Sequence, residues 1–334
     1  MIRGINSFVG APSGARIGPA WVQQLVDLGV QAVRFVVTAD DANQLQLAPY
    51  QAGADLLHAA GIRTLAVLTM ALDRPWVSPT VDRHFYPNEP LGYRGNRRQN
   101  RYILDFARRA QQVAEALAPH GVTSYQIWNE PNLRGLLPIG ANVPPLAPQP
   151  AALAPAVFGA LCYETAGYLR IGGATDIRLG SLSCVGNGVT GPDAHNPYLA
   201  AYLFEALAFL RGTGVPSLPF SHLCLNSELW WTSAQATAIQ QALHQAVLAA
   251  GYTPLPLCIA EWGDTNAAYD ATQVPATIAA LETIGAELYF FQHPYQAGLG
   301  GYGITGWTVA GTQFVPEGPQ SAWWPPVAAW LQGG

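Results

Sequence analysis

The sequence repeats one unit eight times: a short apolar and β-branched run, a loop, and a stretch whose apolar residues recur at helical spacing. The strand-like runs are Ile2–Asn6, Gln31–Val37, Arg63–Met70, Val122–Trp128, Ile177–Cys184, Phe220–Asn226, Leu257–Glu261 and Glu287–Gln292. Alternating strands and helices favour a parallel sheet with helical crossovers. Eight units in 334 residues predict an α/β fold, a single (β/α)8 TIM barrel over residues 1–334, with an open doubly wound sheet as the alternative.

The connections differ in length at the two ends of the predicted barrel. Glycines that predict left-handed helix ends precede five strands: Gly29, Gly61, Gly121, Gly251 and Gly285. Three strand-to-helix loops are long, about residues 71–99, 131–153 and 295–318. In a TIM barrel the loops that follow the strands gather at the carboxyl end, where active sites lie. We therefore expect the functional site among these loops.

Composition excludes several classes of chemistry. All 16 basic residues are arginine, so no lysine can form a Schiff base or serve a Walker A phosphate loop. The net charge of -5 and the lack of a basic run argue against a nucleic-acid partner. No apolar run reaches the roughly 18 residues of a membrane span, which predicts a soluble protein, cytoplasmic as written or secreted if a signal peptide was removed. The four cysteines form no Cys-x-x-Cys pair, so we expect buried free thiols.

Two glutamates end predicted strands that lie across the barrel from each other. Glu130 follows the fourth strand, within Trp-Asn-Glu-Pro-Asn. Glu261 ends the seventh strand, within Ile-Ala-Glu-Trp-Gly. Because the carboxyl ends of all strands meet at one rim, these two carboxylates could flank one glycosidic bond. The alternative without chemistry is that both are rim carboxylates in ion pairs.

Both segments resemble the clan A glycoside hydrolases, the retaining, cellulase-like group that includes families 5 and 39. The resemblance lies in these motifs and their places in the barrel. It implies that Glu130 is the general acid/base, that Glu261 is the nucleophile and that Asn129 binds the sugar 2-hydroxyl. Retention requires carboxyl groups about 5 Å apart, because one protonates the leaving oxygen while the other attacks the anomeric carbon.

Neighbouring strand ends supply candidates for supporting roles. Arg34 is the one charge in an apolar second strand, and the resemblance implies that it hydrogen-bonds Glu261 and keeps it ionised. In the sixth strand His222 and Asn226 share one face by period two, although His222 alone is as well explained as a core histidine. Relatives have a tyrosine that orients the nucleophile near this strand end. Here either Asn226 or Glu228 occupies that place.

Aromatic and basic residues near the rim are candidates for binding sugar. His293 and Tyr295 follow the eighth strand, where relatives tend to place a tryptophan. The tryptophans that could stack on sugar rings are Trp76, Trp230, Trp231, Trp262 and Trp307. A cluster that could bind uronic acids, or simply form a solvated helix entry, contains His84, Arg94, Arg97, Arg98 and Arg101. The solvated helix entry is the favoured interpretation.

The sequence thus predicts a retaining glycoside hydrolase that cleaves a β-linked oligo- or polysaccharide. Long rim loops could line several sugar subsites, which favours endo action. We expect a monomer that needs no cofactor and no metal, since no set of His and Asp ligands marks neighbouring strand ends. The alternative is a catalytically weak barrel that binds carbohydrate, and the presence of both glutamates argues against it.

Overall fold

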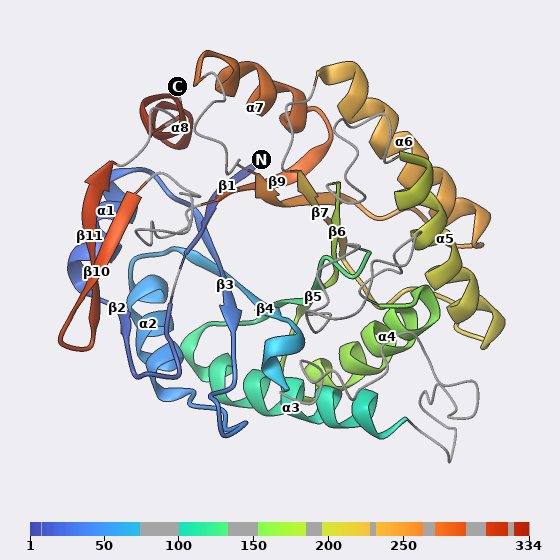
Figure 1. The fold of residues 1–334 in the computed structure, drawn as a ribbon, viewed down its shortest axis with the longest axis horizontal. Helices are drawn as coiled ribbons and strands as arrows, with labels where there is room; N and C mark the ends of the chain where they lie inside the picture. Colours follow the sequence, from blue (N-terminus) through green and yellow to red (C-terminus); the bar gives the residue numbers. More distant parts are fainter. Residues whose placement is uncertain are drawn as a thin grey trace, which may run out of the picture.

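The computed structural model describes residues 1–7, 9–73, 100–132, 153–184, 196–227, 232–262, 271–291, 305–319 and 324–333. Its centre is a closed barrel of eight parallel strands ringed by helices (Figure 1). In order around the barrel the strands are β1 (Ile2–Asn6), β3 (Ala32–Val37), β4 (Arg63–Leu68), β5 (Ser124–Asn129), β6 (Asp176–Ser183), β7 (His222–Ser227), β8 (Leu257–Trp262) and β9 (Gly285–Phe291). Pairing of β9 with β1 closes the ring. The predicted (β/α)8 barrel is therefore confirmed, and the open sheet is excluded.

The helices cover the outside of the barrel because each buries one apolar side against the strands. They are α1 (Pro19–Asp27), α2 (Ala48–Ala59), α3 (Arg101–Leu117), α4 (Pro155–Ile171), α5 (Asn196–Gly212), α6 (Ser233–Ala249), α7 (Val274–Glu282) and α8 (Trp324–Leu331), with short 3-10 turns η1 (Met70–Leu72), η3 (Ala118–His120) and η5 (Ala271–Gln273). In α3 the apolar side is buried, with Phe106, Val113 and Leu117 all 0% exposed. Among the described residues no helix has the length and apolarity to cross a membrane.

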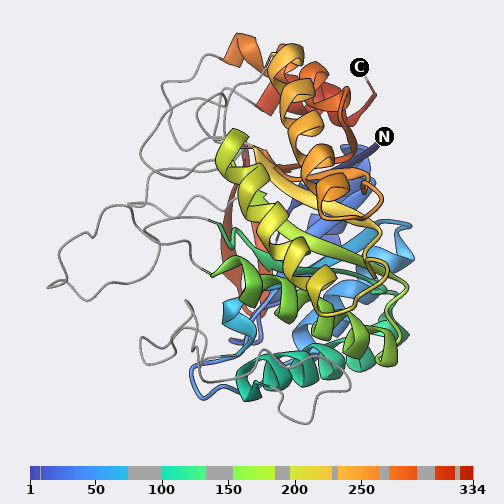
Figure 2. The same cartoon turned by 90° about the vertical axis from the view of Figure 1, so that its right-hand side faces the viewer.

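The helix-to-strand turns follow the predicted glycine pattern with one exception. Gly29, Gly61, Gly121 and Gly251 adopt positive φ angles between 71° and 83°. Gly285 is instead the first residue of β9, so its prediction as a helix end was wrong. Figure 2 shows both chain ends on one side of the molecule, and Arg3 Nη1 donates to the Trp330 carbonyl at 2.7 Å.

A small second sheet lies outside the barrel, and two of its strands fall largely within the segment 295–318, which was predicted from the sequence to be a loop. It consists of β10 (Thr305–Ala310), β11 (Gln313–Pro319) and β2 (Arg16–Ile17). β10 and β11 form a hairpin in which Ala310 faces Gln313, so two residues make the turn. The first of them, Gly311, has φ 63°, a conformation that favours glycine in tight hairpins. The Gly-Thr turn between two β-rich runs was the signal for this hairpin.

Candidate active site

The two predicted catalytic glutamates meet at the carboxyl end of the barrel. Glu130 directly follows β5, and Glu261 lies in β8. Asn226, near the end of β7, donates from one nitrogen to both carboxylates: Nδ2 is 3.2 Å from Glu130 Oε1 and 3.1 Å from Glu261 Oε2. Two oxygens that share one donor at such distances are separated by roughly 6 Å or less, and carboxyl groups about 5–5.5 Å apart are typical of retaining glycosidases.

Arg34 of β3 holds Glu261 from the interior of the barrel. The guanidinium is 2% exposed, and its Nη1 donates to Glu261 Oε1 at 2.6 Å. It also donates to the side-chain oxygens of Asn6 (2.7 Å), Gln126 (2.9 Å) and Asn129 (2.8 Å). A planar guanidinium with four acceptors has a fixed orientation, which a lysine could not reproduce. The ion pair compensates the buried charge of both partners.

The side chain of Asn129 is oriented by the same network. Its Oδ1 accepts from Arg34 Nη2, from Ser181 Oγ at 2.5 Å and from Asn226 Nδ2 at 3.3 Å. Because the oxygen takes all three donors, Nδ2 is left as the free donor, and no described residue accepts from it. The amide can thus donate to an oxygen of a ligand.

Three residues of this network were not predicted from the sequence. Asn6 Nδ2 donates to the Ala260 carbonyl beside Glu261 at 2.9 Å. Gln126 Nε2 donates to Ser181 Oγ at 3.0 Å, and both side chains are 0% exposed. The available signal was a polar residue inside an otherwise apolar strand, since such a residue must find a partner when it is buried.

Irregular strand pairing aims the side chains of Ser181 and Glu261 into the barrel. Along β6, Gly180 and Ser181 together face the single residue Cys224 of β7. Along β8, Ala260 is the extra residue between the pairs that β7 forms with Ile259 and Glu261. A β-bulge of this kind changes which face the following side chain points to. Ser181 and Glu261 therefore reach the polar network.

Two predicted site residues lie elsewhere. His222 is the first residue of β7 and Asn226 the fifth, so about 13 Å of strand separates them even though they share a face. His222 Nδ1 lies 3.0 Å from Ser221 Oγ and 4.0 Å from Asp176 Oδ1, at the amino end of the barrel. Its prediction as a substrate-binding residue was therefore wrong. Trp262 is 1% exposed within the core, so its ring offers no face to a sugar.

The position of His222 has a consequence for stability. Burial, followed by the nearby charge of Arg178, lowers its pKa below the ordinary value of 6.5, while Glu287 and Asp176 act in the opposite sense. Stability linked to neutral His222 is complete above pH 6.5 and is lost as the pH falls through the lowered pKa. We expect His222→Gln to remove this part of the acid destabilisation. Urea unfolding of the wild type and of His222→Gln at pH 7.5, 6.5 and 5.5 measures the free energy of unfolding. If this free energy changed equally with pH in the two proteins, His222 would not be the source of the acid destabilisation.

Other predicted residues lie outside the described part of the chain: Trp76, His84, Arg94, Arg97, Arg98, Glu228, Trp230, Trp231, His293 and Tyr295. Trp307 is in β10, and its side chain is not among those described. Arg101 is exposed at the start of α3, where its guanidinium lies 4.7 Å from the ring centre of Tyr102.

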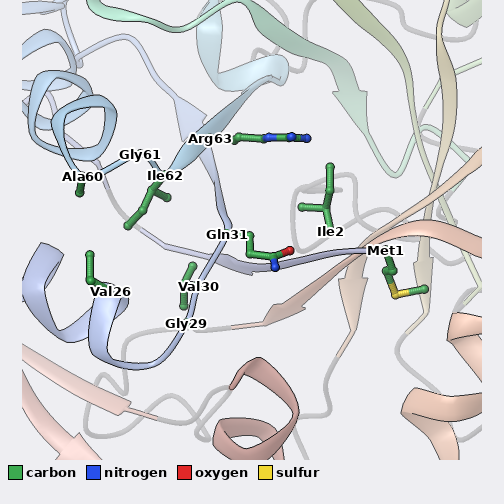
Figure 3. A pocket seen from close by; sticks show the side chains of 10 residues that line it. All are labelled: Met1, Ile2, Val26, Gly29, Val30, Gln31, Ala60, Gly61, Ile62 and Arg63. Atoms are coloured by element: carbon green, nitrogen blue, oxygen red, sulfur yellow. The ribbon is translucent and has the colours of Figure 1, made fainter. Parts of the chain in front are cut away.

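A concavity of about 610 Å³ lies at the opposite end of the barrel (Figure 3). It is formed where β1, β3 and β4 begin, and its lining includes Ile2, Gln31, Ile62 and Arg63. The amino-terminal face of a TIM barrel is usually a face of stability rather than of chemistry. No group of three His, Cys, Asp or Glu side chains suited to a metal ion occurs among the described residues. All four cysteines are buried and free, as predicted.

Comparison with known proteins finds similar structures but no matching sequence. No family model and no curated protein matches this chain. An endo-1,4-β-mannanase from Rhizomucor miehei superposes with a TM-score of 0.59 at 14% identity, covering 91% of this chain and 89% of the other. A β-glucosidase from Exiguobacterium marinum superposes with a TM-score of 0.59 at 14% identity, covering 99% of this chain and 97% of the other. A structure from a study of fungal β-1,4-galactanases superposes with a TM-score of 0.54 at 13% identity, covering 87% of this chain and 89% of the other. At such identities the similarity shows the shared barrel fold.

Proposed function

We propose that this protein is a retaining glycoside hydrolase that cleaves a β-linked oligo- or polysaccharide. The observation that carries the proposal is the shared contact of Asn226 Nδ2 with Glu130 and Glu261 at the carboxyl end of the barrel. Two carboxylates that share one donor are close enough to act on one bond, which supports the proposal. The barrel similarity to a mannanase, a β-glucosidase and galactanases agrees with the proposal.

In the first step Glu261 attacks the anomeric carbon, and the bond from that carbon to the leaving oxygen breaks. Glu130 gives its proton to the leaving oxygen, so the leaving group departs as a neutral alcohol. Arg34 and Asn226 hold one oxygen each of Glu261 and so fix the direction of attack.

In the second step Glu130 takes a proton from water, which attacks the glycosyl-enzyme and releases Glu261. Two inversions at one carbon retain its configuration. The free Nδ2 of Asn129 would donate to the sugar 2-hydroxyl, a contact that strengthens in the transition state. Endo action is inferred from the long segments 71–99 and 131–153, which follow β4 and β5 in the sequence.

The test is turnover of a panel of aryl β-glycosides and soluble β-glucans, β-mannans, β-galactans and xylans. We expect hydrolysis of at least one class, with the β-anomer as the first product in proton NMR. The α-anomer as first product would exclude the retaining mechanism. Saturable binding of a glycan without any turnover would instead support the alternative, a barrel that binds carbohydrate.

A further inference from the structure

The end of β5 departs from regular strand geometry just before the proposed acid. Trp128 and Glu130 have φ angles of 71° and 51°, which are uncommon for residues other than glycine. Regular alternation would place Trp128 on the same face as Gln126, which points into the barrel and contacts Arg34. Trp128 instead packs outward, with its ring 5.7 Å from that of Phe106 in α3. The next residue, Asn129, consequently turns into the site.

Gly180 makes room for this turn from the neighbouring strand. The pairs Ile127–Leu179 and Asn129–Ser181 place Gly180 opposite Trp128. A Cβ at Gly180 would overlap the carbonyl oxygen of Ile127 and approach that of Trp128 to 2.9 Å, and both obstacles are backbone atoms. The Trp128 carbonyl also accepts from Gln126 Nε2 at 2.8 Å, so the turned peptide is fixed by a buried hydrogen bond.

The same stretch of β6 also holds the backbone of Glu130. The backbone N–H of Glu130 donates to the Ser181 carbonyl at 2.8 Å. Glu261 is held by other elements, namely β8 itself, Arg34 of β3 and Asn226 of β7. A change at Gly180 would thus displace Glu130 more than Glu261.

We propose that Gly180 is a positioning residue for Glu130: the missing side chain lets β5 turn at Trp128 and so aims the acid at the leaving oxygen. The proposal rests on the proposed glycosidase function. A misaligned acid slows the cleavage of poor leaving groups more than that of good ones, because poor leaving groups depend more on protonation. A purely structural defect would slow the cleavage of all leaving groups equally.

The experiment is kcat/KM of Gly180→Ala on a series of aryl β-glycosides whose phenols differ in acidity. This parameter reports bond cleavage and is independent of the later hydrolysis of the glycosyl-enzyme. For the unsubstituted phenyl glycoside we expect a loss of roughly 10²- to 10³-fold, within the range of general acid catalysis. For the dinitrophenyl glycoside, whose leaving group needs no proton, we expect a loss below about 10-fold.

Gly159→Ala is the matched control. Gly159 lies in α4 away from the site, and its Cβ would come within 2.6 Å of the Ala206 carbonyl, so it imposes a comparable steric conflict. We expect its effect to be equal for all leaving groups. If Gly180→Ala does not fold, Phe106→Leu decides, because it loosens Trp128 from the outer side and is expected to show the same dependence more weakly.

Equal losses for all leaving groups, or no loss, in a folded Gly180→Ala would overturn the proposal while leaving the glycosidase function intact. If Gly180→Ala does not fold, equal losses for all leaving groups, or no loss, in Phe106→Leu would overturn the proposed role of Gly180. Inactivity of the wild type on every glycoside would refute the proposed function, and this inference with it.

Discussion

Glu261→Ala is expected to lower kcat/KM on an aryl β-glycoside by roughly 10⁴- to 10⁶-fold, similar to the losses found when one residue of a serine protease's catalytic triad is removed. No other carboxylate among the described residues contacts Arg34. The variant also leaves that buried guanidinium without its counter-ion, so Glu261→Gln, which keeps a hydrogen-bond acceptor, serves as the more conservative companion. Circular dichroism and urea unfolding establish that each variant is folded. A folded Glu261→Ala with wild-type rates would contradict the proposed mechanism.

Azide separates the roles of the two glutamates. In Glu261→Ala the anion can occupy the vacated space beside Arg34 and attack the anomeric carbon directly, which is expected to give an α-glycosyl azide from a β-glycoside. In Glu130→Ala azide is expected to attack the glycosyl-enzyme and give the β-glycosyl azide. NMR of the two products measures this. Exchanged configurations would mean that the roles of Glu130 and Glu261 are reversed.

The barrel could be predicted from the sequence because its signals are local and repeated. The boundaries of β1 were predicted to the residue, and those of the other barrel strands to within two residues at either end. The hairpin of β10 and β11 was not predicted, since its partner is β2, almost 300 residues earlier in the chain. Pairing at such a distance leaves only the short Gly-Thr turn as a local signal.

The candidate site was only partly predictable for a related reason. Glu130 directly follows β5, whereas Asn129, Glu261 and Arg34 lie within strands. The structure brings all four together with Asn226. The alternation of side chains along a strand shows which face a residue shares, but not at which end of the barrel it lies. For this reason His222 was wrongly grouped with Asn226 as a site residue. Bulges cannot be predicted from one strand alone either. The turn at Trp128 depends on a glycine that follows it by 52 residues and lies opposite it.

A second buried ion pair occupies the amino-terminal half of the barrel. Arg178 of β6 and Glu287 of β9 are each 5% exposed, and Arg178 Nη2 lies 3.1 Å from Glu287 Oε1. Arg178 Nη2 also donates to Asp176 Oδ2 at 2.7 Å. The Tyr289 hydroxyl donates to Glu287 Oε2 at 2.9 Å. These contacts link strands that are not neighbours in the ring, so the pair spans the interior of the barrel.

Glu287→Ala is expected to lower the free energy of unfolding by about 3–5 kcal/mol, because it leaves a buried guanidinium without one of its two carboxylate partners. Such a loss is a large part of the roughly 5–15 kcal/mol that stabilises most proteins. Urea unfolding followed by tryptophan fluorescence measures it. Asp105→Ala is the matched control, since Asp105 forms an ion pair with Arg108 at 3.6 Å in which both side chains are more than half exposed. We expect that control to change stability by less than about 1 kcal/mol.

Replacing both charges tests whether the cost comes from the unpaired guanidinium or from lost packing. In the variant that combines Arg178→Met, Glu287→Leu and Tyr289→Phe no buried charge of the pair remains, so most of the lost stability is expected to return. A combined variant as unstable as Glu287→Ala would show that packing dominates. Because the pair lies at the end of the barrel opposite Glu130 and Glu261, the activity per folded molecule is expected to stay at the wild-type level in every variant of this series.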